Sequence, residues 1–141
     1  MKKFFFISIL IMSGLLLNGC SSDKNKLISI MLPENPSTGY AWHFTFDKDS
    51  VLRLESDNYK SSETAQNVRG NWGVHTFNFE PVSKGEVTIT FYYYRSNEKR
   101  RKPIAELSYQ YRVDKKGIIE YVGTSGSLPD SMPNLSDIQK N

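Results

Sequence analysis

Alternation of apolar and polar residues at every second position runs through this chain, and it limits the possible folds more than any other feature. Residues 87–93 and 105–113 show it most clearly, with Val, Ile, Leu, Ala, Phe and Tyr at the alternate positions. A two-residue period puts apolar side chains on one face of a β-strand, whereas a helix needs them three or four residues apart. No segment sustains the helical spacing, so the sequence predicts an all-β fold.

Shorter segments of the same kind predict further strands, and turn-forming residues separate them. Ser83-Lys84-Gly85 and residues 114–117 are the clearest turns. Six or seven short strands with aromatic and branched residues facing inward are typical of a β-sandwich. The further strands are expected at residues 27–32, 40–46, 52–59, 77–81 and 118–122, and the last should cover a sheet edge that would otherwise be open.

Two segments lack strand periodicity. Residues 60–69 are polar and aperiodic, which predicts a mobile loop. Ser, Pro, Asn and Asp dominate residues 123–141, and this composition predicts a disordered polar tail. The predicted sandwich domain is therefore residues 27–122.

The start of the chain has the layout of a secretory signal. Lys2 and Lys3 precede an apolar run over residues 4–17, which is short for a membrane-spanning helix. The run ends at Cys20, which follows a glycine and precedes two serines and thereby resembles a bacterial lipoprotein processing site. A plain secretory signal with an incidental cysteine is the alternative.

The lipoprotein resemblance implies that residues 1–19 are removed as a signal peptide and that Cys20 carries the lipid. Residues 20–26 would then form a tether, and the protein would face outward from a membrane of the bacterial cell envelope. Because Cys20 is the only cysteine, the mature chain would have no disulfide and no thiol ligand, so an ordinary apolar core must stabilise it.

The charge balance predicts no attraction to nucleic acid. The formal charge is +3, and removal of Lys2 and Lys3 with the signal leaves +1. The one dense basic run, at residues 99–102, is expected to be a solvated loop tip. Contact with an acidic partner or with anionic headgroups is the alternative for this run.

Residues that could carry catalysis or hold a cofactor are few. His43 and His75 are the only histidines, each on a predicted strand and outside any ligand spacing, so no metal is expected and each should be half-exposed. The segment Gly123-Thr124-Ser125-Gly126-Ser127 lacks the strand-to-helix context that a nucleophile elbow needs. The sequence therefore predicts a protein that is not an enzyme and has no cofactor.

One loop stands out as a candidate binding element. It reads Asn35-Pro36-Ser37-Thr38-Gly39-Tyr40 and leads directly into an aromatic strand that contains Trp42. Pro36 fixes its own φ, the Asn35 amide can bond to nearby backbone N–H groups, and Gly39 can take a positive φ. The pattern predicts a short, stiff, exposed loop, although an ordinary β-turn would account for the same residues.

Together with two later segments, this motif resembles the chagasin-like inhibitors of papain-like cysteine peptidases. That family has an Asn-Pro-Thr-Thr-Gly-Tyr/Phe motif followed by Trp, a glycine-rich second loop and an Arg-Pro-Trp third loop. Here the second loop corresponds to Gly70-Asn71-Trp72-Gly73 and the third to the region of Arg95, where the family's Pro and Trp are absent.

The resemblance implies an immunoglobulin-like β-sandwich of six to seven strands whose three loops share one end. It also implies that the partner is a papain-like cysteine peptidase and that Asn35, Pro36, Ser37, Thr38, Gly39, Tyr40, Gly70, Asn71, Trp72, Gly73 and Arg95 bind it. Thr38 and Gly39 would lie near the catalytic cysteine and exclude substrate, and the inhibitor is expected to act as a monomer.

Trp72 is one candidate to replace the aromatic ring missing from the third loop, and the basic run at residues 99–102 is another source of contacts. A surface module that binds sugar or an envelope protein through Tyr92 and Tyr94 is the alternative function on the same fold.

Overall fold

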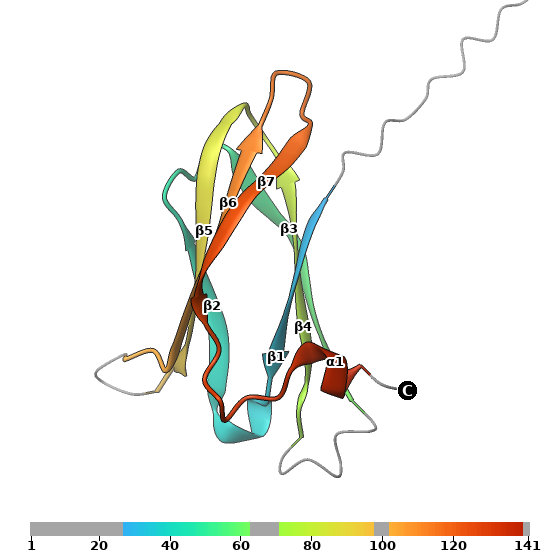
Figure 1. Ribbon diagram of the computed structural model, residues 1–141, viewed down its shortest axis with the longest axis vertical. Helices are drawn as coiled ribbons and strands as arrows, with labels where there is room; N and C mark the ends of the chain where they lie inside the picture. Colours follow the sequence, from blue (N-terminus) through green and yellow to red (C-terminus); the bar gives the residue numbers. More distant parts are fainter. Residues whose placement is uncertain (1–26, 63–70, 98–101, 140–141) are drawn as a thin grey trace, which may run out of the picture.

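The computed structural model describes residues 27–62, 71–97 and 102–139. These residues form seven strands in two antiparallel sheets, together with two short helical turns (Figure 1). The three-stranded sheet has the order β1 (Ile28–Glu34), β4 (Gly73–Pro81), β3 (Leu52–Ser61). The four-stranded sheet has the order β2 (Tyr40–Phe46), β5 (Gly85–Arg95), β6 (Ala105–Val113), β7 (Ile119–Ser127). The turns are a 3₁₀ helix, η1 (Pro36–Thr38), and α1 (Leu135–Ile138). This architecture confirms the predicted β-sandwich.

Aromatic rings from both sheets fill the space between them. Phe79 of β4 and Phe91 of β5 are fully buried, and the Phe44 ring of β2 lies edge-on to Phe79 with centroids 5.2 Å apart. Burying a side chain of this size contributes about 1.5–3 kcal/mol. The alternating pattern of the strands therefore sets which face of each sheet points inward, as the sequence predicted.

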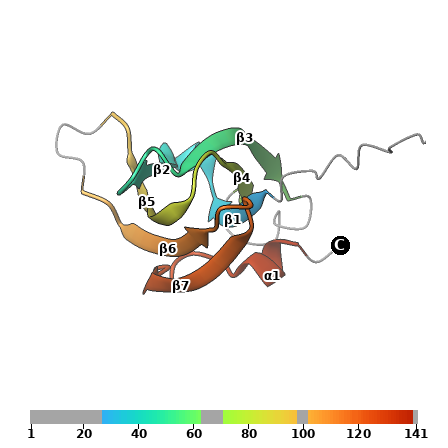
Figure 2. The same cartoon turned by 90° about the horizontal axis from the view of Figure 1, so that it is seen from above.

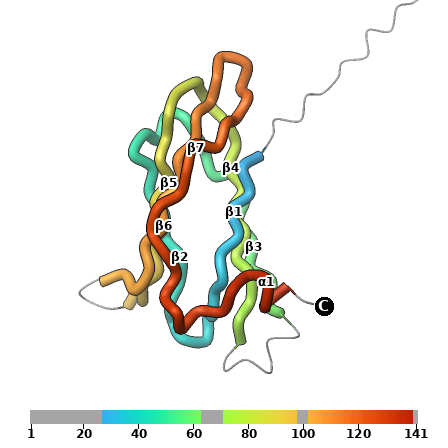
Figure 3. The backbone as a smooth tube through the Cα atoms, in the orientation of Figure 1, coloured from blue at the N-terminus to red at the C-terminus, as the bar shows by residue number. Residues whose placement is uncertain are grey.

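The strand ends that flank three connections lie at the same end of the sandwich, called the loop end below (Figure 1). The first is residues 35–39 between β1 and β2, the second joins β3 to β4, and the third joins β5 to β6. The register requires this arrangement, because Glu34 pairs with Gly73 and Tyr40 pairs with Arg95. The tube trace in Figure 3 shows the ends of β1, β3 and β5 at one end of the sandwich and the start of β1 at the other.

The prediction of a disordered tail from residue 123 onward is wrong. β7 continues to Ser127 and pairs with β6 along its whole length. Gly126 has φ +91°, and a Cβ there would lie 2.1 Å from the carbonyl oxygen of Glu106. Small residues in this segment therefore allow close approach of two strands rather than disorder, since β6 offers unpaired backbone groups.

Residues 128–139, which follow β7, also pack against the domain. Met132 and Ile138 are buried, and α1 contacts β1 and β4. In the end-on view of Figure 2, α1 lies beside β1 at the edge of the sandwich. The domain therefore extends beyond the predicted boundary at residue 122 and includes the packed segment as far as Ile138.

Smaller differences concern the second loop and the chain start. β3 extends through Ser61, beyond the predicted end at residue 59, because it stays paired with β4 up to Gly73. The predictions for residues 63–69, Gly70 and 99–101, and those for residues 1–26 with Cys20, lie outside the described residues. Among the residues described, no helix is long and apolar enough to cross a membrane.

Loss of β7 should destabilise the domain, since β6 would then present an open edge. Truncation of the chain after Lys115 removes the whole β6–β7 ladder together with the buried Met132 and Ile138. We expect a clearly lower melting temperature in a thermal denaturation scan. A melting temperature equal to that of the full chain would show that β7 does not support the sandwich.

Tyr111 should make the domain sensitive to alkali. Burial, with smaller effects from Tyr109 and Tyr121, raises its pKa from 10.0 to about 12. The unfolded state loses this proton above pH 10 while the folded state retains it, so stability is full below pH 10 and falls as the pH rises toward 12. The loss is on the order of 2 kcal/mol. Chemical denaturation at several pH values should give a smaller fall for Tyr111→Phe, and equal falls in both proteins would contradict this.

Candidate functional site

The first loop is held in shape by its own hydrogen bonds. The Asn35 Oδ1 atom accepts from the Ser37 backbone N–H at 3.2 Å and from the Ser37 hydroxyl at 2.5 Å. The Thr38 hydroxyl donates to the Asn35 carbonyl at 2.7 Å, and Pro36 begins the η1 turn. Gly39 ends the turn in the left-handed region at φ +76°. The Asn35 bond to a backbone N–H, the place of Pro36 at the start of the turn and the positive φ of Gly39 agree with the sequence prediction.

Only part of this loop faces solvent. Pro36, Ser37, Thr38 and Gly39 are exposed, whereas Asn35 is 3% exposed. The Asn35 side chain is therefore turned toward the loop itself and shapes the tip. The surface that this loop offers to a partner consists of residues 36–39.

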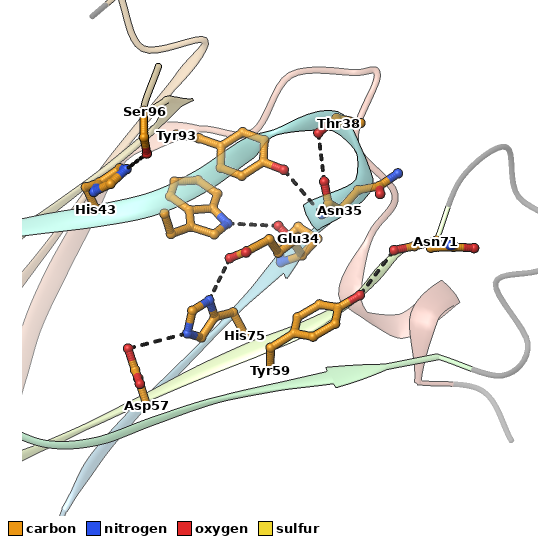
Figure 4. Close-up of polar contacts among 12 residues, drawn as sticks. Glu34, Asn35, Thr38, His43, Asp57, Tyr59, Asn71, His75, Tyr93 and Ser96 are labelled. Carbon is orange, nitrogen blue, oxygen red and sulfur yellow. Dashed lines mark hydrogen bonds and ion pairs between the residues drawn. The ribbon is translucent and has the colours of Figure 1, made fainter. Parts of the chain in front are cut away.

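Two buried rings support the loop from beneath (Figure 4). The Trp42 Nε1–H donates to the Pro33 carbonyl at 2.8 Å, and the Asn35 backbone N–H donates to the Tyr93 hydroxyl oxygen at 3.2 Å. The rings of Trp42 and Tyr93 lie 4.8 Å apart. Burial raises the pKa of Tyr93, with an opposing effect from its bond to Asn35, so the hydroxyl stays neutral beneath the loop.

A cluster of ionisable side chains that sequence reasoning missed lies at the same place. The Glu34 side chain, 7% exposed, contacts His75 with Oε2 2.6 Å from Nδ1, and the Asp57 carboxylate lies 3.7 Å from the His75 Nε2 (Figure 4). The cluster joins the residue before the first loop to β4 and β3. His75 is half-buried, as predicted, but its ring faces inward and stacks on Phe77 at 4.1 Å.

The alternating inward and outward side chains of β1 and β4 could have indicated this cluster. Glu34 continues the inward-facing series of Ile30 and Leu32, and His75 continues that of Phe77. A polar side chain at the end of an inward-facing series needs a buried partner. Finding which partner required the register of β1 on β4, which pairs Leu32 with His75.

Arg95 of the third loop lies against the first loop. Its Nε–H donates to the Thr38 carbonyl at 3.2 Å, and its guanidinium lies 4.7 Å from the centre of the Tyr40 ring. Tyr40 in turn stacks on Tyr93 with ring centroids 5.4 Å apart. The structure thus brings together Arg95, Tyr40 and Thr38, which the sequence assigned to one site.

The second loop ends at residues 71–73, called its root below, and this root lies beside the first loop. Gly73 is buried in the sheet, Asn71 is exposed and its carbonyl accepts from the Tyr59 hydroxyl at 3.1 Å. Trp72 is half-buried and packs against the core. A hollow of about 380 Å³ separates this root from Pro36 and Ser37. Burial, with a smaller effect of the Glu34 charge, raises the pKa of Tyr59, so its hydroxyl remains a donor.

The outer face of the four-stranded sheet carries the other aromatic residues considered above. Tyr92 and Tyr94 are half-buried, and the Tyr94 ring stacks on His43 at 4.1 Å. The His43 Nε2 lies 3.1 Å from the Ser96 hydroxyl. One face of Tyr94 is therefore occupied by another ring, which leaves less of it for stacking on a sugar. Within residues 27–62, 71–97 and 102–139, no group of three His, Asp or Glu side chains could hold a metal ion.

Comparison with known proteins finds one matching family model and similar proteins. The family model for chagasin family peptidase inhibitor I42 matches residues 21–126. Amoebiasin-2 of Entamoeba histolytica is 30% identical over 119 residues, which cover 77% of this chain and 96% of that protein. The crystal structure of the cysteine protease inhibitor EhICP2 from Entamoeba histolytica is 32% identical, with a TM-score of 0.55 over 60% of this chain and 75% of that one. This chain belongs to the chagasin family of peptidase inhibitors.

Proposed function

We propose that this cysteine peptidase inhibitor acts by occlusion, with the loop end of the sandwich entering the active-site cleft of a papain-like enzyme. The first loop would block the catalytic cysteine through Thr38 and Gly39, and the segment 70–73 and Arg95 would contact the cleft on either side. The observation that supports this most is the common end of the three connections, with residues 36–39 exposed at its tip.

The stiffness of the first loop supports inhibition rather than cleavage. The loop is already ordered by the Asn35 and Thr38 hydrogen bonds, so little conformational freedom is lost on binding. Arg95 holds the Thr38 carbonyl from the side. A carbonyl fixed in the wrong orientation cannot align with an attacking thiolate, so the loop would be a poor substrate.

The direct test is a titration of residues 21–141 against several papain-like cysteine peptidases. We expect reversible, competitive inhibition with one inhibitor per enzyme, and no cleavage of the first loop over the time of the assay. Absence of inhibition across the panel, or rapid cleavage after Thr38 or Gly39, would contradict the proposal.

Trp72 is proposed to supply the aromatic contact that the third loop lacks. Because its ring is half-buried against the core, only one side is available to a partner. We expect Trp72→Ala to weaken inhibition about 30-fold, as for an aromatic anchor near the centre of an interface. If Trp72→Ala inhibits as strongly as the unaltered protein, Trp72 does not supply this contact.

We further propose that Cys20 carries a lipid that anchors the inhibitor, as a monomer, to the outward face of a bacterial membrane. The strand order supports this orientation, since β1 starts at the end opposite the loops (Figure 1). An anchor on the preceding residues would leave the loop end facing away from the membrane. Labelling with radioactive palmitate should mark the unaltered protein, and the label should be lost in Cys20→Ser. No label on the unaltered protein would contradict the anchor, and a label that persists in Cys20→Ser would contradict attachment at Cys20.

A further inference from the structure

The segment after β7 packs at the loop end, although the family match stops at residue 126. Figures 1 and 3 show residues 128–139 running from the end of β7 across to β1 and α1 at that end. Leu128 packs against the core, and Met132 and Ile138 are 8% and 4% exposed. The segment is therefore a packed addition on the side that carries the candidate site.

One residue joins this segment to the second loop. The Ser62 hydroxyl donates to the Ile138 carbonyl at 2.6 Å, in a part-buried position. The Ser62 backbone N–H donates to the Trp72 carbonyl at 3.1 Å and so closes the root of the second loop. The Gln139 amide lies 3.6 Å from the Met31 sulfur and ties the same segment to β1.

The first loop and the root of the second are joined at their bases, where Glu34 of β1 pairs with Gly73 of β4. The hollow of about 380 Å³ lies between them and is lined by Pro36, Ser37, Ser62 and Trp72, among others. The hollow adds no contacts between the two loops beyond this pairing. Contacts from elsewhere in the chain can therefore add to the support of the second loop.

We propose that residues 128–139 act as a brace that positions the root of the second loop relative to the first, through the bond between Ser62 and Ile138. The brace rests on the proposed function, because the two loops must enter one cleft together. It increases affinity without touching the peptidase, by keeping the binding surface in the bound arrangement. Ser62 and Ile138 are then positioning residues.

The chain offers a matched control for this inference. The Ser83 hydroxyl donates to the Ser50 carbonyl, also at 2.6 Å, at the end opposite the loops. Ser62→Ala and Ser83→Ala therefore each remove one bond from a serine hydroxyl to a backbone carbonyl, part-buried at Ser62 and exposed at Ser83. We expect Ser62→Ala to dissociate from the peptidase about fivefold faster. Ser83→Ala should dissociate at the unaltered rate, and Ser62→Thr, which keeps the hydroxyl, should restore slow dissociation.

A readout without peptidase separates the brace from the proposed function. The amide of residue 62 should be less protected from hydrogen exchange, relative to its intrinsic rate, in Ser62→Ala than in Ser83→Ala, because the brace holds the root of the second loop closed. Equal exchange in the two variants, or equal dissociation rates, would overturn the brace. Failure of the unaltered protein to inhibit, with faster exchange still seen in Ser62→Ala, would instead overturn the proposed function and leave the packing role established.

Discussion

Gly39→Val should weaken inhibition of a papain-like peptidase by about 100-fold, or about 2.7 kcal/mol of binding free energy. Gly39 has φ +76°, and nothing lies within 4 Å of the position of an added Cβ. The cost of valine therefore comes from backbone strain, since a β-branched residue is disfavoured in this region. The tip of the first loop would relax away from its inhibitory shape, and the side chain would block close approach to the catalytic cysteine. Inhibition assays measure the loss of affinity, and thermal denaturation measures the accompanying loss of stability.

Gly117→Val is the matched control for this change. Gly117 has φ +75°, equally open surroundings and a place in the β6–β7 turn, at the end opposite the loops. Both variants should lose a similar amount of stability, but only the Gly39 variant should lose inhibition. Equal inhibition by the two variants would show that the first loop does not enter the cleft.

Trp42→Ala should reduce the free energy of unfolding by about 3–5 kcal/mol, the range for removing a large buried ring. The Trp42 side chain is 5% exposed, packs on Tyr93 and Phe91, and donates to the Pro33 carbonyl beneath the first loop. The substitution leaves a cavity and frees the chain segment that enters the loop. Urea denaturation measures the loss.

Trp42→Phe separates packing from the hydrogen bond. It keeps a ring but removes the donor to Pro33, which should cost about 1 kcal/mol of stability. Inhibition should weaken in this variant too, because the Pro33 carbonyl loses the bond that fixes the loop entry. A loss below about 1 kcal/mol for Trp42→Ala would contradict the role of this ring in the core.

The strands and the first loop were predictable because local chemistry determines them. Alternating side chains at residues 87–93 choose a face of the sheet, and Pro36 and Gly39 can adopt few other conformations in such a short connection. The pairing of β2 with β5 then brings Arg95 to the first loop, although the residues around Arg95 do not by themselves predict this contact.

The remaining features depend on contacts between distant residues, which local patterns do not specify. The pair of Glu34 and His75 exists only because β1 and β4 are in one register. β7 beyond residue 122 is polar and glycine-containing, and it forms a strand because β6 provides a partner. The buried positions of Met132 and Ile138 likewise depend on a sandwich edge that lies far away in the sequence.

Protection of the peptidase's catalytic cysteine from alkylation tests the occlusion mechanism most directly. The thiolate of a papain-like enzyme reacts with iodoacetamide when its cleft is open. With saturating inhibitor, we expect alkylation to slow strongly, and the Gly39→Val variant at the same concentration to give much less protection. Alkylation at the rate of the free enzyme while the inhibitor remains bound would show that the loop end does not cover the catalytic cysteine.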